Sequence, residues 1–170
     1  MFRIIPLCTA LVVAIPMSRC HHPSDKENCS LTGAPDGMIQ GRSAIINRGT
    51  DKDLVGAYSN RCLAYEIRGD HDRAIADCDQ AIKLDPKYAR AYAGRGLVYE
   101  DKGDHDRAIT DYGMAIELDP KLPAVYAKRG LVYAKKGDKQ HAIADLSEAI
   151  ELDPANEGFK KTLSILGKMP

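Results

Sequence analysis

The sequence lacks tryptophan, has only two phenylalanines and carries no net charge, because 24 basic side chains balance 24 acidic ones. Proteins that bind nucleic acid or anionic membranes by electrostatics usually carry an excess of basic residues, so the balance argues against both classes. No apolar run reaches the roughly 20 residues that a membrane-spanning helix needs. At 44% apolar and 28% charged residues, the chain of 170 residues still has the composition of a folded protein.

Motifs for catalysis, metal binding and nucleotide binding are also missing. The five cysteines form no C-x-x-C pair, which removes the usual signal of a zinc or dithiol site. No segment matches a phosphate-binding glycine-rich loop, and no Ser, Cys or carboxylate accompanies a histidine in a recognisable catalytic order. The aspartate-rich strings lack the glycine and glutamate of a calcium-binding loop. We therefore expect no enzyme activity, no cofactor, no metal site and no small-molecule substrate.

The cysteines leave the question of a disulfide open. In an oxidising compartment, Cys29, Cys62 and Cys78 could form one disulfide and leave one free thiol, but an odd number does not identify the pair. The simpler interpretation, which we adopt, is that Cys62 and Cys78 are small buried core residues.

The N-terminus has the pattern of an export signal. Arg3 precedes an apolar stretch from Ile4 to Pro16, which is typical of a secretory signal peptide. We expect residues 1–20 to be cleaved after export to the periplasm or outside the cell, and residues 21–34 to form a flexible leader. Acylation of Cys20, or a signal that is not cleaved, would instead anchor the protein to the membrane.

The strongest signal in the sequence is a repeat of 34 residues. Leu-Asp-Pro occurs at 84–86, 118–120 and 152–154, and few architectures have this period. It divides the chain into units at 55–88, 89–122 and 123–156. Among the positions that keep the same residue in all three units are Tyr58, Tyr92 and Tyr126 at position 4; Tyr65, Tyr99 and Tyr133 at 11; Ala74, Ala108 and Ala142 at 20; Ala81, Ala115 and Ala149 at 27.

Each unit has the pattern of a helix pair. Apolar residues at positions 4, 8 and 11 share one face of a helix, and a second apolar set from position 20 has the same spacing. Gly-Asp between the sets suits a left-handed helix end followed by a new N-cap, and Asp-Pro ends the second helix. The units resemble the tetratricopeptide repeat (TPR) family. This resemblance implies an all-α fold, a right-handed α-solenoid of antiparallel helix pairs.

A solenoid must cover the apolar faces at its two ends. Residues 35–54 are interpreted as a degenerate half repeat, because Met38-Ile39 and Ile45-Ile46 reproduce the spacing of Ala74-Ile75 and Ala81-Ile82. At the other end, residues 157–170 are expected to form a capping helix and tail.

Charged residues also follow the period. Arginine at position 7 recurs with aspartate at position 23, which gives the sets Arg61, Arg95 and Arg129, and Asp77, Asp111 and Asp145. The arginines could form an anion-binding ladder. We prefer structural ion pairs between the two helices of each unit, because partly buried charges without partners would be costly.

In proteins of the TPR family, which this chain resembles, the first helices of the repeats line a concave groove that binds a partner. The resemblance places these residues there: Ser59, Leu63, Glu66, Ile67, Ala93, Leu97, Glu100, Asp101, Ala127, Leu131 and Lys135. The row of leucines and the acidic-to-basic rim distinguish this groove from the groove of those family members that bind chaperone tails. We therefore expect a scaffold or adaptor for a protein or peptide in the bacterial cell envelope. Self-association into a structural oligomer is the first alternative, and an enzyme built on the scaffold is the second.

Overall fold

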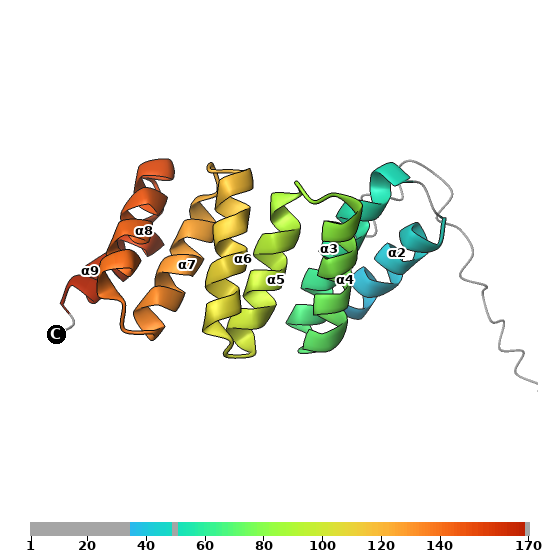
Figure 1. Cartoon of the computed structure of the whole chain (residues 1–170), viewed down its shortest axis with the longest axis horizontal. Coiled ribbons are helices and arrows are strands. Elements are labelled where there is room, and N and C mark those ends of the chain that lie inside the picture. Colours follow the sequence, from blue (N-terminus) through green and yellow to red (C-terminus); the bar gives the residue numbers. More distant parts are fainter. Residues whose placement is uncertain (1–34, 49–50, 169–170) are drawn as a thin grey trace, which may run out of the picture.

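The computed structural model describes residues 35–48 and 51–168, which form eight α-helices and no strand (Figure 1). The predicted signal peptide, 1–20, and leader, 21–34, lie outside these residues. No helix in the described part of the chain is both long enough and apolar enough to span a membrane.

The helices follow one another along the long axis of the molecule, so that α2 and α9 lie at opposite ends (Figure 1). Three antiparallel pairs, α3 with α4, α5 with α6 and α7 with α8, correspond to the three 34-residue units. The expected all-α solenoid is therefore confirmed. The bounds are α2 (Pro35–Arg48), α3 (Asp51–Ile67), α4 (His71–Leu84), α5 (Ala89–Asp101), α6 (His105–Leu118), α7 (Pro123–Lys135), α8 (Lys139–Leu152) and α9 (Glu157–Gly167).

The first helix of the first unit begins earlier than the repeat predicts. α3 begins at Asp51, before the expected start of the unit at residue 55. The later first helices, α5 and α7, begin directly after an Asp-Pro turn, where proline restricts the backbone that precedes it. No such turn precedes the first unit, so nothing in the sequence prevents the helix from extending.

The turns within the pairs need backbone conformations that glycine adopts most easily. Asp104 and Asp138 cap the following helix as expected, each accepting a hydrogen bond of 3.1 Å from the backbone N–H three residues further on. Asp70 makes no such bond; its carboxylate pairs with Nε of Arg73 at 2.9 Å and with Nη2 of Arg68 at 3.4 Å. The glycines with positive φ are Gly69, Gly103 and Gly137, at 76°, 77° and 82°.

The two helices of a unit approach most closely where position 8 of the first faces position 24 of the second. In the second unit, a Cβ added to Gly96 would lie 2.9 Å from the ring of Tyr112. In the third unit, a Cβ on Gly130 would lie 3.1 Å from the backbone oxygen of Ala142 and from Cβ of Asp145, and 3.4 Å from Cγ of Leu146. Tyr112 and Leu146 are both buried, so the large side chain occupies the space that glycine leaves empty.

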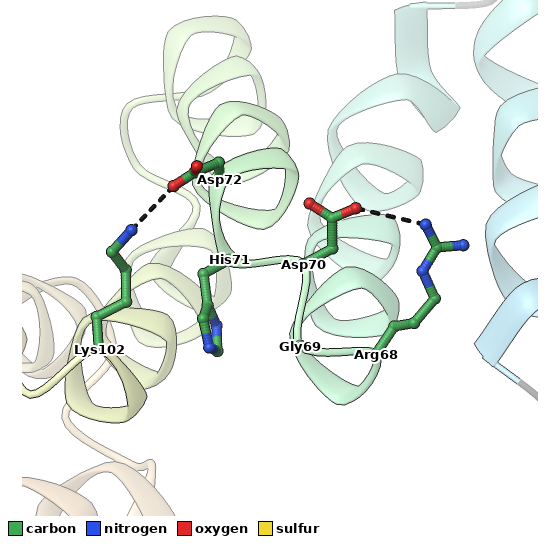
Figure 2. A pocket seen from close by; sticks show the side chains of 6 residues that line it. All are labelled: Arg68, Gly69, Asp70, His71, Asp72 and Lys102. Carbon is green, nitrogen blue, oxygen red and sulfur yellow. Dashed lines mark hydrogen bonds and ion pairs between the residues drawn. The ribbon is translucent and has the colours of Figure 1, made fainter.

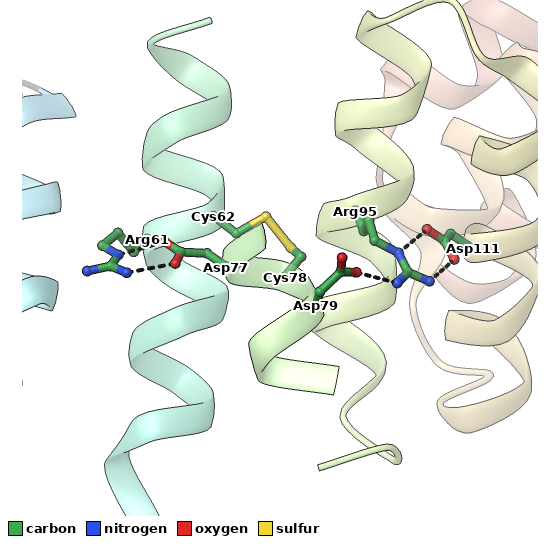
Figure 3. Close-up of a disulfide and its surroundings, with 7 residues drawn as sticks. All are labelled: Arg61, Cys62, Asp77, Cys78, Asp79, Arg95 and Asp111. Atoms are coloured by element: carbon green, nitrogen blue, oxygen red, sulfur yellow. Dashed lines mark hydrogen bonds and ion pairs between the residues drawn. A yellow bond between two sulfur atoms is a disulfide. The ribbon is translucent and has the colours of Figure 1, made fainter. Parts of the chain in front are cut away.

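In the first unit, a disulfide between Cys62 and Cys78 occupies the same two positions (Figure 3). Both residues are fully buried. The bond also lies against the next unit, because a Cβ on Gly94 of α5 would be 3.2 Å from Sγ of Cys78. The interpretation of the two cysteines as buried core residues is correct about burial but omits the covalent bond.

Arginine at position 7 and aspartate at position 23 lie together in all three units. Each guanidinium donates from Nε and Nη2 to the two carboxylate oxygens of its aspartate, as Figure 3 shows for the first two units. The aspartates are buried, and the arginine carbons Cζ lie 5.6 to 5.8 Å from the centroids of the tyrosine rings at position 4. The pairs are Arg61 with Asp77, Arg95 with Asp111, and Arg129 with Asp145.

The remaining guanidinium nitrogen connects neighbouring units. Nη1 of Arg95 donates to Oδ1 of Asp79 in the preceding unit at 2.6 Å, and Nη1 of Arg61 donates to Oγ of Ser43 in α2 at 2.9 Å. Helix α2 therefore makes the contact that a second helix makes elsewhere in the stack, in keeping with its interpretation as the second helix of a leading half repeat.

Helix α9 covers the last pair at the C-terminal end of the stack. Leu166 is buried against the core of α7 and α8, and Phe159 and Leu163 pack beside it. The side chain of Asn156 caps the helix by accepting hydrogen bonds from the backbone N–H groups of Gly158 and Phe159. Ile165 faces away from this contact and is 56% exposed.

The disulfide can be tested against the packing that replaces it in the other units. Cys62→Ala/Cys78→Ala should lower the free energy of unfolding by about 3 kcal/mol, because a cross-link over a loop of this length restricts the unfolded chain. Cys62→Gly/Cys78→Leu, which copies the third unit, should recover part of this loss by refilling the buried space. Urea unfolding measures both. Equal midpoints for the two variants would contradict the interpretation that the disulfide substitutes for the glycine and its large partner.

The ion pairs predict unequal costs for the same substitution in different units. Arg95→Ala removes the partner of buried Asp111 and also the contact with Asp79, so we expect a loss of about 3 kcal/mol. Arg129→Ala should cost less, since the preceding unit offers only Gly113 at the place of Asp79. Thermal and urea unfolding compare the variants. An unchanged melting temperature for Arg95→Ala would contradict a structural role, and equal losses would contradict the contribution of Asp79.

Candidate functional site

The residues predicted to bind a partner lie on α3, α5 and α7, which are neighbours in the stack. We call the surface that these three helices present together the first-helix face. Its predicted residues differ in how accessible they are. Ser59, Glu100 and Ala127 are buried; Leu63, Glu66, Ala93 and Leu97 are partly buried; Ile67, Asp101, Leu131 and Lys135 are exposed.

The apolar row of the first-helix face is open at some points and covered at others. Ile67 is 62% exposed and Leu131 is 36% exposed. Leu63 is covered in part by α5, because its Cδ2 would lie 3.5 Å from a Cβ on Gly94. Burial of Ser59 and Ala127 removes them from the accessible set. Ile67 and Leu131, with partly buried Leu63 and Leu97 between them in the row, are therefore the apolar groups that a partner could reach.

Glu100 forms a buried polar centre beneath this face. Its carboxylate accepts hydrogen bonds from the phenol of Tyr112 at 3.0 Å and from Nζ of Lys135 at 2.6 Å, and Nζ of Lys128 is 3.8 Å away. Burial, and next the charge of Glu100, raise the pKa of Tyr112 well above its usual range. Glu100 thereby connects α5 to both α6 and α7, and its negative charge has partners within the fold.

Glu66 and Asp101 form a second carboxyl pair nearby, across the contact between α3 and α5. The pKa of Glu66 is raised to about 6 by burial, by the hydrogen bond with Asp101 and by the charge of Asp101, while the charge of Lys128 opposes the rise. Among the described residues, neither carboxyl has an ion pair. The carboxyl of Glu66 therefore keeps its proton to a higher pH than an ordinary glutamate does.

Sequence reasoning missed two residues of these centres, Lys128 and Tyr112. Position 6, which Lys128 occupies, has a different residue in each unit, so the repeat contains no signal for it. Tyr112 stands at position 24 opposite Gly96, and this register could have identified it as a buried residue. Its hydrogen bond to Glu100 depends on the three-dimensional contact between α5 and α6.

A hollow of about 390 Å³ lies at the turn between α3 and α4 (Figure 2). Its charged side chains pair with one another or with α2: Lys102 with Asp72, and Arg68 with Asp70 and Asp36. Lys136 and Asp106 repeat the first pair in the next unit. These contacts connect adjacent units, so we assign the hollow to the architecture of the stack.

The histidines of this edge do not assemble a catalytic group. Nδ1 of His71 is buried without a hydrogen-bond partner, and so is Nδ1 of His105 at the same position of the next unit. His141 is exposed and pairs with Asp138 at 2.7 Å. In the described part of the chain, no three His, Cys, Asp or Glu side chains are grouped so that they could hold a metal ion.

The carboxyl pair predicts a pH dependence of stability that Glu66→Gln should remove. Because the folded pKa of Glu66 lies above the ordinary value of 4.5, folding favours its protonated form, and this contribution is lost as pH rises through about 6. Glu66→Gln should therefore be more stable than the wild type above pH 6, with the difference shrinking toward pH 4.5.

Urea unfolding between pH 4.5 and 7.5 measures this difference, and NMR titration of the Glu66 carboxyl measures the pKa directly. Glu117→Gln, at an exposed carboxylate of α6, is the matched control and should leave the pH profile of the wild type unchanged. Parallel profiles for Glu66→Gln and the wild type would contradict the raised pKa of Glu66.

Family models match most of the repeat region. A model described as tetratricopeptide repeat matches residues 55–88 and 123–156, another with the same description matches 78–110, and one described as TPR repeat matches 100–137. A search of curated proteins finds no match.

Solved structures of similar fold contain the same repeat. MamA is 28% identical, with 81% of this chain and 78% of that chain covered and a TM-score of 0.67. The first TPR of Spaghetti (RPAP3), bound to the HSP90 peptide SRMEEVD, is 20% identical over 68% and 92% of the chains, with a TM-score of 0.65. The second TPR domain of human RPAP3, in complex with the HSP70 peptide SGPTIEEVD, is 24% identical over 71% and 100%, with a TM-score of 0.66.

The repeat units, the helix pairs and these matches agree, and the chain belongs to the tetratricopeptide repeat family.

Proposed function

We propose that this protein is a non-catalytic adaptor that binds a protein or peptide segment on the first-helix face and works in the bacterial cell envelope. The observation that carries the proposal is the apolar row of that face. Ile67 and Leu131 remain exposed in a stack whose other large apolar side chains are mostly packed between helices. Exposed apolar groups that lie together with polar neighbours are typical of protein interaction sites.

The similar structures support peptide binding as a general mode but not one particular ligand. Two of them are TPR domains described with bound chaperone peptides, and both peptides end in acidic residues. Here the first-helix face carries carboxylates of its own, on Glu66 and Asp101. An acidic tail would meet like charges at these positions, so we do not extend that ligand class to this protein.

Two features support a location outside the cytoplasm. The N-terminal pattern of Arg3 and the following apolar stretch is typical of an export signal. The disulfide between Cys62 and Cys78 favours an oxidising compartment such as the periplasm, since disulfides are rare in the cytosol. Acylation at Cys20, or retention of the signal, would keep the same stack at the membrane surface.

Self-association is a second candidate, and one exposed side chain favours it. Ile165 projects from the terminal helix α9 and is 56% exposed, so two stacks could meet at their C-terminal ends. Light scattering over a range of concentrations separates the two functions. A monomer at all concentrations is the result that the adaptor function predicts.

Affinity capture from an envelope extract tests the binding face. Leu63→Glu/Leu97→Glu/Leu131→Glu and the milder Leu131→Glu should each retain at least about tenfold less of the main partner than the wild type, because a charge on the apolar row must be desolvated on binding. Leu84→Glu is the matched control, since Leu84 is 47% exposed on the second helix α4. Circular dichroism checks that every variant is folded. An identical set of partners for Leu131→Glu and the wild type would overturn the assignment of the face.

A further inference from the structure

The third unit leaves one hydrogen-bond donor of its position 7 arginine without an acceptor. In the first unit, Nη1 of Arg61 donates to Oγ of Ser43 at 2.9 Å. In the second, Nη1 of Arg95 donates to Oδ1 of Asp79 at 2.6 Å. Arg129 uses Nε and Nη2 for its own aspartate in the same way, but its Nη1 has no hydrogen bond to any described residue. The contacts that connect the first two units (Figure 3) are therefore interrupted before the third.

The interruption lies where the preceding helix carries glycine. Gly113 of α6 stands at the repeat position of Asp79. Among the described residues, a Cβ added to Gly113 would meet only Nη1 of Arg129 within 4 Å, at 3.7 Å. The space that the side chain of Asp79 fills beside Arg95 is thus open beside Arg129. The side chains of the two arginines are equally exposed, at 22%, so another molecule can reach the open guanidinium nitrogen.

The second unit shows which chemical group fits this gap. Arg95 holds two carboxylates at once, that of Asp111 through Nε and Nη2 and that of Asp79 through Nη1. A bidentate pair therefore leaves room for a second carboxylate, because the N–H donors of a guanidinium lie along more than one edge of the planar group. An aspartate or glutamate of another molecule can bind beside Arg129 in the same manner, through a charge-assisted hydrogen bond.

The surroundings of the gap add an apolar contact and one like charge. Met114 follows Gly113 in α6 and is 36% exposed, so an apolar side chain next to the acidic one could pack on its flexible thioether. Glu117 lies one turn further along α6, is exposed and does not pair with Arg129. Its charge disfavours a run of carboxylates. The ligand that fits best has a single acidic side chain beside an apolar one.

This gap is separate from the first-helix face. Arg129 and Leu131 are two residues apart in α7, so their side chains leave the helix about 200° apart, on opposite sides. A ligand at Arg129 and a partner on Leu131 would contact different surfaces of the stack. The inference therefore goes beyond the proposed function and does not depend on it.

We propose that the gap between Gly113 and Arg129 is a docking point for an acidic side chain of a partner protein. The partner's carboxylate accepts a hydrogen bond from Nη1 of Arg129, and its apolar neighbour packs on Met114. The carboxylate takes the place beside Arg129 that Asp79 takes beside Arg95. Among the described residues, the other two position 7 arginines already have this acceptor within the fold, which limits the docking point to the third unit.

Side-chain NMR can locate this contact with model peptides. The isotope-labelled full chain is titrated with two blocked peptides of about ten residues, identical except for one position between two leucines that carries aspartate or asparagine. The Nε–H signal of Arg129 should shift and saturate with the aspartate peptide, whereas that of Arg95, whose acceptor is Asp79, should not move. The asparagine peptide should bind about fivefold more weakly.

Two substitutions move the gap from one unit to the other. Gly113→Asp copies Asp79 and should abolish the response of Arg129, because the fold then supplies the carboxylate. Asp79→Gly opens the same gap beside Arg95, whose signal should then respond to the aspartate peptide. Gln80→Asp adds the same charge at an exposed position of α4 and is the matched control, which should change neither response. Circular dichroism checks that every variant is folded.

Four results would overturn the inference. The first is an Arg129 signal that does not respond to the aspartate peptide, and the second is equal affinity for the two peptides. The third is a response that persists in Gly113→Asp. The fourth is an Arg129 shift that grows with protein concentration in the absence of peptide, which would identify a second copy as the occupant. None of these results bears on the first-helix face, which the capture experiment with Leu131→Glu tests.

Discussion

The two helices of each unit can pack only because position 8 of the first helix leaves room for position 24 of the second. A Cβ on Gly96 would meet the ring of Tyr112, and one on Gly130 would meet the backbone oxygen of Ala142 and Cβ of Asp145, with Leu146 beside them. The same close approach of the two helices brings the position 7 arginine within reach of the position 23 aspartate. In the first unit, the cysteines satisfy the same requirement with a bond instead of a contact.

Electrostatics then adds directional contacts to this packing. The aspartates at position 23 are buried, and each would be costly without its arginine. Since every unit contains one arginine and one aspartate of this kind, the charge balance of the whole sequence arises in part from the repeat. The guanidinium groups also lie over tyrosine rings, which accounts for part of the regular placement of the tyrosines.

Most of the fold can be predicted from the sequence, because local and periodic signals determine it. The Gly-Asp turns and the Leu-Asp-Pro ends mark each helix pair, and the period gives the stacking. Asp70 shows where this reasoning ends: like Asp104 it pairs with an arginine three residues further on, yet only Asp104 also caps its helix. The disulfide illustrates a signal that was present but unused, since Cys62 and Cys78 occupy the two positions that pack together in every other unit.

The binding face is less predictable for a physical reason. The resemblance places residues on the face, but their exposure depends on the next unit, as Leu63 beneath α5 shows. Lys128 lies at a position that the units do not share, and the link between Glu66 and Asp101 forms across two units. Features that break the period have no counterpart elsewhere in the sequence, and only the assembled stack shows which of them meet.

The position of the disulfide has a consequence for the order of folding. A solenoid can start to fold at any unit and then add its neighbours, so the most readily formed pair decides the direction of growth. The bond joins residues only 16 apart and, once formed, keeps α3 and α4 together even in an otherwise unfolded chain. The cross-linked pair is thus a template on which α5 docks at Gly94, and assembly proceeds from there toward α9.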